Sequence, residues 1–334
     1  MLKESTSAPE LRAELARLYL WYGFAASGIG ENPTDIVLPA YDAALAIQQQ
    51  LVKEQPENRS FRADLGWTMI YAKLWHNPLG FRIYQPQAIA IFERLALEDP
   101  GDPFARLGLV WALGLGEFKS LDTPEKVAMS ERRLTLLEQL LKEYPQSAEI
   151  RRDLATQLAA YPVPGENASD SRAKLVRISR ANELRAGYLA ALERLDPAAR
   201  TPLHPRDSGS RTLRPTVVYG KFDLANGWRV ESQVLAQLKR WPESGSFADR
   251  ATDLSRGLLE ENPSVKTFAG LLSLCFSNRV EVAEKSGDQT GAQVHRLEAD
   301  NFWRTHPSIE RLDGFYQPAK SEAVKTKEIK EQSP

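Results

Sequence analysis

Apolar residues recur along the chain every three or four positions, which is the spacing of one buried face of an α-helix. The clearest runs read "AIQQQLVKEQP", "AIFERLALEDP" and "LLEQLLKEYP", and they end at Pro56, Pro100 and Pro145. In each run a leucine lies five residues before the proline, and an apolar residue lies four residues before that leucine. Proline cannot donate a backbone hydrogen bond and disfavours helical geometry in the residue before it. Each run therefore predicts an amphipathic helix that ends next to its proline.

A second phrase follows each proline at a fixed distance. It reads "ELRAELA" at residues 10–16, "SFRADLG" at residues 60–66 and "EIRRDLA" at residues 149–155. Counting from the proline, with Thr6 in its place in the first copy, position +6 is always arginine and position +9 is always leucine. The three prolines are 44 and then 45 residues apart. The repeating unit is therefore a first helix, a turn, a second helix and a proline corner.

A helical hairpin of this kind cannot bury its apolar stripe alone, so consecutive hairpins are expected to stack on one another. We predict an all-α fold, a right-handed superhelical solenoid of stacked hairpins with a period of about 44–50 residues. Looser copies of the second-helix run end at Pro197, Pro263 and Pro307. The predicted organisation is a repeat array (1–160), a long helix followed by an irregular linker or insertion (161–230), divergent helical repeats (231–317) and a charged, disordered tail (318–334).

The predicted insertion contains two kinds of pattern. A long helix is expected at about 173–195, and the proline-rich and serine-rich stretch 198–216 is typical of a linker. The run "VVYGKFDLANGWRVES" that follows surrounds an Asn-Gly pair with apolar residues, which suits a short β-hairpin. A helix that begins near Trp228 is the alternative, and the sequence leaves both open.

The repeating phrases resemble the tetratricopeptide repeat. Ala88 and Phe92 fall at its small and aromatic positions in the second helix, Pro100 at its closing proline, and Leu65–Gly66 at its Leu-Gly pair in the first helix. The resemblance covers residues 8–160 well and 245–315 in part. The period exceeds the usual 34 residues by about ten. This extra length is expected between the two helices, as in residues 73–87, and would alter the concave surface of the array.

The longer period is similar to that of the repeats that follow the kinase domain in some large bacterial serine/threonine kinases. The chain begins in the middle of a repeat, and the resemblance therefore implies a further domain upstream, a protein kinase among the candidates.

A tetratricopeptide array implies a groove that binds a peptide, lined by its first helices. Aromatic and arginine side chains are favoured anchors at such surfaces because they bury a large area. The alternative for each tryptophan at helical spacing is packing in the core. The candidate groove residues are Arg17, Trp21, Trp67, Tyr71, Trp111 and Arg152.

The arginines at position +6 form the most regular polar column in the sequence. Stacked hairpins would place their side chains in a row, where their planar forks could bind carboxylates or phosphates of a partner. The alternative is that each arginine pairs with an acid of a neighbouring repeat, and this alternative is favoured. The column consists of Arg12, Arg62, Arg106 and Arg151.

Composition narrows the class of function. The chain has 43 basic and 44 acidic residues and a net charge of −1, so a nucleic-acid-binding or anionic-membrane protein is not expected. There is one cysteine, and the four histidines form no HExxH motif, so neither a metal site nor a cofactor is predicted. No nucleophile elbow or phosphate-binding loop is present, and catalytic residues are not predicted. No signal peptide or membrane span is recognised, and a cytoplasmic protein is expected.

These observations favour a scaffold for protein–protein interaction that has no chemistry of its own. A partner peptide or helix would bind in the groove of the first helices. The alternatives are a structural or self-assembly module, the regulatory region of a larger kinase and, less favoured, a hydrolase on an α/α scaffold. A self-assembly module predicts apolar surface on a terminal repeat, and a hydrolase predicts a deep pocket with converging acids.

Overall fold

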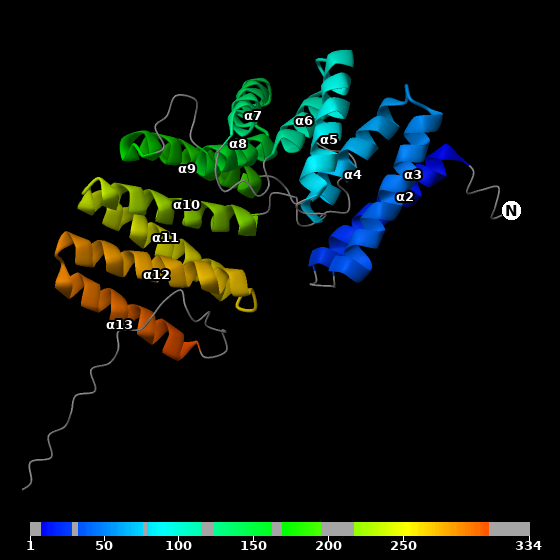
Figure 1. Ribbon diagram of the computed structural model, residues 1–334. Coiled ribbons are helices and arrows are strands. Elements are labelled where there is room, and N and C mark those ends of the chain that lie inside the picture. Colours follow the sequence, from blue (N-terminus) through cyan, green and yellow to red (C-terminus); the bar gives the residue numbers. More distant parts are fainter. Residues whose placement is uncertain are drawn as a thin grey trace, which may run out of the picture. The chain divides into compact units, whose positions relative to one another are not determined.

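The computed structural model describes residues 8–28, 33–75, 79–114, 123–161, 169–194 and 217–306. These ranges fold into α-helices and one π-helical turn, without any strand (Figure 1), so the predicted all-α class is confirmed. First and second helices of the hairpins alternate. The first helices are α2 (Pro9–Gly28), α4 (Arg59–Trp75), α6 (Pro103–Leu113), α8 (Ala148–Ala160), α10 (Val217–Gln237) and α12 (Lys266–Ser286). The second helices are α3 (Leu38–Glu54), α5 (Leu79–Glu98), α7 (Pro124–Glu143), α9 (Ser171–Arg194), α11 (Trp241–Glu261) and α13 (Gln289–Thr305), and the turn η1 (Pro33–Val37) precedes α3.

The chain divides into two compact units. The first contains residues 1–157 and 195–214, and the second contains residues 158–194 and 215–334. None of the helices in the described ranges is long and apolar enough to cross a membrane.

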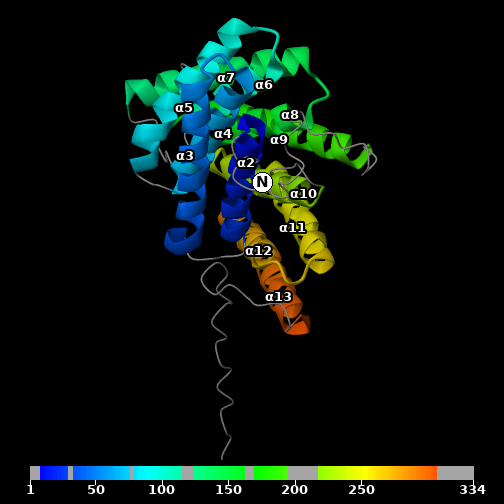
Figure 2. The ribbon, with the colours of Figure 1, turned by 90° about the vertical axis from the view of Figure 1, so that its right-hand side faces the viewer.

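In the first unit each helix packs on the next one along the chain, from α2 to α7, and α2 and α6 also contact α4. Figures 1 and 2 show α2, α3, α4 and α5 as neighbouring helices. Their shared core contains Tyr41, Leu65, Phe92, Leu95 and Leu109, all at most 5% exposed. The leucines at position −5, and those at position +9 in α4, α6 and α8, are core residues, as their spacing predicts. Leu15 of α2 is the exception at position +9: it is 40% exposed, so the prediction of a core leucine is wrong there.

Local sequence sets the ends of these helices. Asp102 precedes Pro103 and its carboxylate accepts hydrogen bonds from the backbone N–H groups of Phe104 and Ala105, which caps α6. Thr123 caps α7 in the same way, before Pro124. The helix α3 ends at Glu54, two residues before Pro56, and α7 ends at Glu143, two residues before Pro145, as predicted.

The second unit has the same order of packing. Each helix from α9 to α13 packs on the next, and α10 also contacts α12. Figure 1 shows α10 to α13 as neighbouring rods, from yellow-green to orange. The core contains Leu259, Phe268, Leu272, Phe276 and Phe302. The predicted helix at 173–195 is α9, while the predicted linker at 198–216 and the predicted tail at 318–334 lie outside the described residues.

The β-hairpin considered for the stretch around the Asn-Gly pair is wrong, and so is a helix start near Trp228. The whole stretch belongs to α10, which begins at Val217. Gly227 is in this helix because α9 passes close to it: a Cβ atom there would lie 2.0 Å from Asn182 Oδ1. The glycine that suggested a turn is required by helix packing.

The extra length of the repeat also lies elsewhere than predicted. Most of residues 73–87 belong to helices, since α4 ends at Trp75 and α5 begins at Leu79. Pro86 lies inside α5, and its side chain is exposed. The extra length of this repeat therefore lies in its helices, since α4 has 17 residues and α5 has 20.

Candidate functional site

Three of the four arginines at position +6 make two-pronged contacts with glutamates in the second helix of their own hairpin. Arg62 Nη1 and Nη2 each donate to a carboxylate oxygen of Glu98 at 2.7 Å. Arg106 does the same to Glu143 at 2.7 and 2.6 Å. Arg12 Nη1 lies 3.0 Å from Glu54 Oε1, and its Nη2 also donates to this carboxylate. This planar, charge-assisted geometry is the strongest form of an arginine–carboxylate pair.

The partner acids share one position in the repeat, two residues before the closing proline. Glu261 stands at the same place before Pro263, and it accepts from Lys221 Nζ at 3.0 and 3.1 Å. Lys221 lies six residues after Pro215, which is the arginine position of the repeat. The same link between first and second helix therefore occurs in four hairpins, including one in the second unit.

Arg151 is the member of the column with a different partner. Residue 195, two positions before Pro197, is a leucine. Arg151 donates instead to the backbone carbonyl of Pro145, from Nε at 3.0 Å and from Nη2 at 2.6 Å. It therefore binds the turn that precedes its own helix.

The charge pairs strongly lower the pKa values of two of the partner carboxyl groups. The hydrogen bonds from Arg12 lower the pKa of Glu54 to about 2, and those from Arg62 lower the pKa of Glu98 to about 2. Arg62 is buried at 5% exposure, whereas the Arg12 side chain keeps 25%. Arg12, Arg62 and Arg106 thus tie the two helices of their own hairpins, whereas Arg151 does not. The sequence-based alternative was an acid of a neighbouring repeat, but the acids observed belong to the same hairpin.

The candidate groove residues lie on consecutive first helices. Trp67 of α4 packs edge-on against Trp111 of α6, with ring centroids 6.1 Å apart, and against Phe92 of α5 at 5.4 Å. Both tryptophans are partly exposed at the margin of the core, and Tyr71 is buried in it. Trp21 of α2 is also partly exposed.

Polar contacts continue this surface from one first helix to the next. Arg17 of α2 donates to Asp64 of α4, from Nη2 at 3.1 Å and from Nε at 3.3 Å. Trp111 of α6 hydrogen-bonds to Asp153 of α8, next to Arg152. Burial raises the pKa of Asp153, and the nearby arginines and the indole oppose this effect. In both contacts the residue at position +11 meets the acid at position +8 of the following repeat.

A wedge of one aromatic ring between two glycines aligns α4, α5 and α6. Phe92 is 1% exposed, and a Cβ atom on Gly108 would lie 2.2 Å from its ring, and one on Gly66 2.7 Å. The Leu-Gly pair indicated Gly66, but the sequence analysis did not single out Gly108. A glycine inside an apolar helical run, as in "FARLGLVWAL", is the signal that could have found it.

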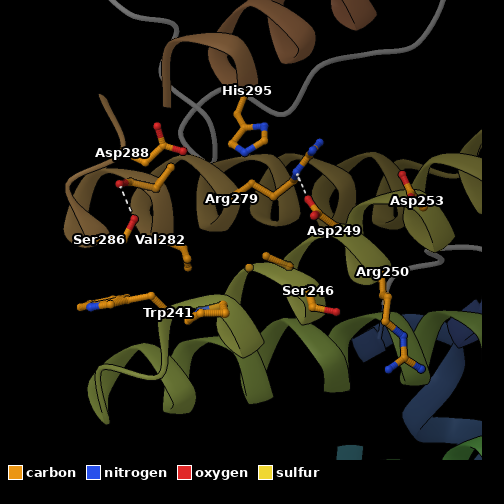
Figure 3. Close-up of a pocket in the computed structure, with 14 residues that line it drawn as sticks. Trp241, Ser246, Asp249, Arg250, Asp253, Arg279, Val282, Ser286, Asp288 and His295 are labelled. Atoms are coloured by element: carbon orange, nitrogen blue, oxygen red, sulfur yellow. Dashed lines mark hydrogen bonds and ion pairs between the residues drawn. The ribbon is translucent and has the colours of Figure 1, made fainter. Parts of the chain in front are cut away.

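A hollow of about 570 Å³ lies between α11, α12 and α13 (Figure 3). Arg279 Nε lies 2.7 Å from Asp249 Oδ1 across it, and Arg279 Nη1 lies 2.7 Å from Glu298 Oε2. Burial and the charge of Arg279 lower the pKa of His295 beside it. The guanidinium group of Arg279 is thus paired with the carboxylates of Asp249 and Glu298. The described residues contain no group of three or more His, Cys, Asp or Glu side chains that could hold a metal ion.

Comparison with known proteins gives no family for this chain. No protein-family model matches it, and no curated protein matches it. Among solved structures it is similar to the crystal structure of BtubC (BKLC) from P. vanneervenii, with 14% sequence identity and a TM-score of 0.48. The match covers 86% of this chain and 95% of that chain. A similarity of this size carries no conclusion about function.

Proposed function

We propose that this chain is a non-catalytic interaction module, a tetratricopeptide-like solenoid that binds a peptide or helix of a partner protein. The partner would bind along the first helices, over the surface formed by Arg17, Trp21, Trp67, Trp111 and Arg152, with Tyr71 beneath it. The order of packing within each unit supports the solenoid, since each helix contacts the next from α2 to α7 and from α9 to α13. Successive first helices also touch, in the pairs α2 and α4, α4 and α6, and α10 and α12.

The observation that carries the proposal is the pair of Trp67 and Trp111. These large side chains come from successive hairpins, pack edge to face and keep part of their surface accessible. Tryptophan and arginine are enriched among binding hot spots, and tryptophan buries a large area at a low cost in side-chain entropy. The Arg17–Asp64 pair and the Trp111–Asp153 contact place polar groups beside this aromatic pair.

Selection of a random 16-residue peptide library on the immobilised chain provides a ligand for the test. Calorimetry then compares wild type with the Trp67→Ala/Trp111→Ala variant, and circular dichroism checks that each protein is folded. We expect the double variant to bind selected peptides at least about tenfold more weakly, the usual loss when a hot spot is truncated.

Two further variants make the test specific. Trp241→Ala removes a partly exposed tryptophan from the hollow of the second unit and should leave the affinity unchanged. If the alanine variant does not fold, the milder Trp67→Phe/Trp111→Phe variant takes its place in the test. Its loss of affinity for the peptide should be smaller but measurable. Equal affinity for wild type and a folded groove variant would exclude this surface as the binding site.

A further inference from the structure

The helix α2 carries an apolar stripe that faces outward. The stripe repeats at steps of four, three and four residues, which keeps it on one face of the helix. Leu18 is 65% exposed, and the other members are between 38% and 57% exposed. The α2 stripe consists of Leu11, Leu15, Leu18 and Tyr22, with Tyr19 beside it.

The same repeat positions are buried in the other first helices of this array. The stripe occupies positions +5, +9, +12, +13 and +16 of the repeat. In α4 these positions are at most 5% exposed, and in α6 and α8 those from +5 to +13 are at most 3% exposed. The buried equivalents are Phe61, Leu65, Thr68, Met69 and Ala72 in α4, Ala105, Leu109, Ala112 and Leu113 in α6, and Ile150, Leu154, Gln157 and Leu158 in α8.

The structure shows what covers these positions, because the second helix of the preceding hairpin touches position +12. In the first unit Gln85 of α5 donates to the carbonyl of Ala112 in α6 at 2.9 Å. Gln157 of α8 donates to Ser130 Oγ of α7 at 2.7 Å. Gln85 and Ser130 both stand fifteen residues before the proline that closes their hairpin.

The second unit repeats this contact. Gly227, at position +12 after Pro215, lies against Asn182 of α9, which again stands fifteen residues before its proline. Cys275, at position +12 of α12, lies 3.3 Å from Ser255 Oγ of α11. The face that α2 leaves exposed is therefore the face by which a first helix receives a preceding second helix.

We propose that the α2 stripe is a docking surface for an amphipathic helix of the second-helix type, supplied by a partner polypeptide. Such a helix carries apolar residues at i and i+4, as α3, α5 and α7 do at Ile47/Leu51, Ile91/Leu95 and Leu136/Leu140. It lies antiparallel to α2 and buries the leucines as α5 buries their equivalents in α6. The stripe shares no residue with the surface proposed for the peptide.

The probe for this surface is the chain's own α7 sequence, residues 123–145, made as a fluorescein-labelled peptide with a lactam bridge and verified as helical by circular dichroism. In the intact chain α7 itself packs on α8, so the α8 face is already covered. An added copy of the α7 sequence is therefore expected to bind the equivalent exposed face, which is the α2 stripe. Fluorescence anisotropy with the full chain measures binding. Saturable binding by wild type is expected, and no binding of the verified helix overturns the proposal.

Leu11→Glu/Leu18→Glu is the test variant, because both side chains are more than half exposed and are not needed for the fold. We expect this variant to bind the peptide at least about a hundredfold more weakly than wild type. The complex would no longer bury two leucine side chains, and it would have to bury two carboxylates instead. Val294→Glu/Leu297→Glu is the matched control, because these leucine-sized side chains of α13 are 55% and 57% exposed. This control should bind like wild type, and equal loss in both variants overturns the assignment.

Self-association is the competing occupant, since the steps of four and three residues also suit a pair of identical helices. Sedimentation velocity of the full chain alone distinguishes the two. A monomer, with binding of the peptide, supports the proposal. A dimer that Leu11→Glu/Leu18→Glu dissociates identifies a second copy as the occupant and overturns it. A Leu136→Glu/Leu140→Glu version of the peptide should not bind, because it lacks the apolar stripe.

Discussion

At the scale of single residues, the repeat is held by one recurring charge pair. A guanidinium or ammonium group at position +6 meets a carboxylate two residues before the closing proline, in the pairs Arg12–Glu54, Arg62–Glu98, Arg106–Glu143 and Lys221–Glu261. The arginine recurs visibly in the sequence. The partner glutamate also recurs in the repeating phrases. Arg62 and Glu98, however, are 36 residues apart in the sequence, and only the folded hairpin shows that they pair. The sequence therefore predicts the column and leaves its partners open.

These pairs make stability depend on pH in a defined window. Glu54 and Glu98 have a pKa of about 2 in the folded chain, against an ordinary value of 4.5. A carboxylate with a lowered folded pKa stabilises the fold above its unfolded pKa, and this contribution is lost as the pH falls toward 2. We expect the urea midpoint of wild type to drop steeply between about pH 4.5 and 2.

The variant Glu54→Gln/Glu98→Gln provides the control for this window. Its midpoint should lie below that of wild type at pH 7 and should fall less steeply in acid, so that the two curves converge near pH 2. Parallel curves over the whole range would show that other carboxylates cause the acid sensitivity.

At the scale of helices, close approach depends on glycines that the hydrophobic pattern does not explain. Gly66 and Gly108 admit the ring of Phe92, and Gly227 admits Asn182. The sequence predicted the helices α2 to α9 through their apolar spacing and prolines. It failed at α10, where an Asn-Gly pair has the local signal of a turn and tertiary packing prevails.

A glycine-to-alanine pair tests this packing. Gly108→Ala adds a Cβ atom 2.2 Å from Phe92, so we expect a loss of about 1–3 kcal/mol in the free energy of unfolding from overpacking. Gly257→Ala in α11 has no heavy atom within 4 Å of the new Cβ atom, and it should stabilise the helix by about 0.5–1 kcal/mol. Urea unfolding measures both. Similar stability changes in the two variants would contradict the wedge.

At the scale of the whole molecule, one packing rule accounts for both units. Positions +5, +9 and +12 are buried in α4, α6, α8, α10 and α12, whereas α2 keeps them exposed. The sequence shows that α2 is apolar at these positions, yet periodicity alone does not reveal which apolar face lacks a neighbour. For the same reason the sequence could propose Trp67 and Trp111 as groove residues without stating their exposure.

The position of a bound peptide is the most direct test of the account, because the central claim assigns binding to the first helices. A selected peptide that carries a central benzophenone is irradiated in complex with the full chain, and mass spectrometry identifies the cross-linked residues. The account predicts attachment within α4 and α6, close to Trp67 and Trp111, and loss of attachment in the Trp67→Ala/Trp111→Ala variant. Attachment confined to the hollow between α11, α12 and α13 would contradict it.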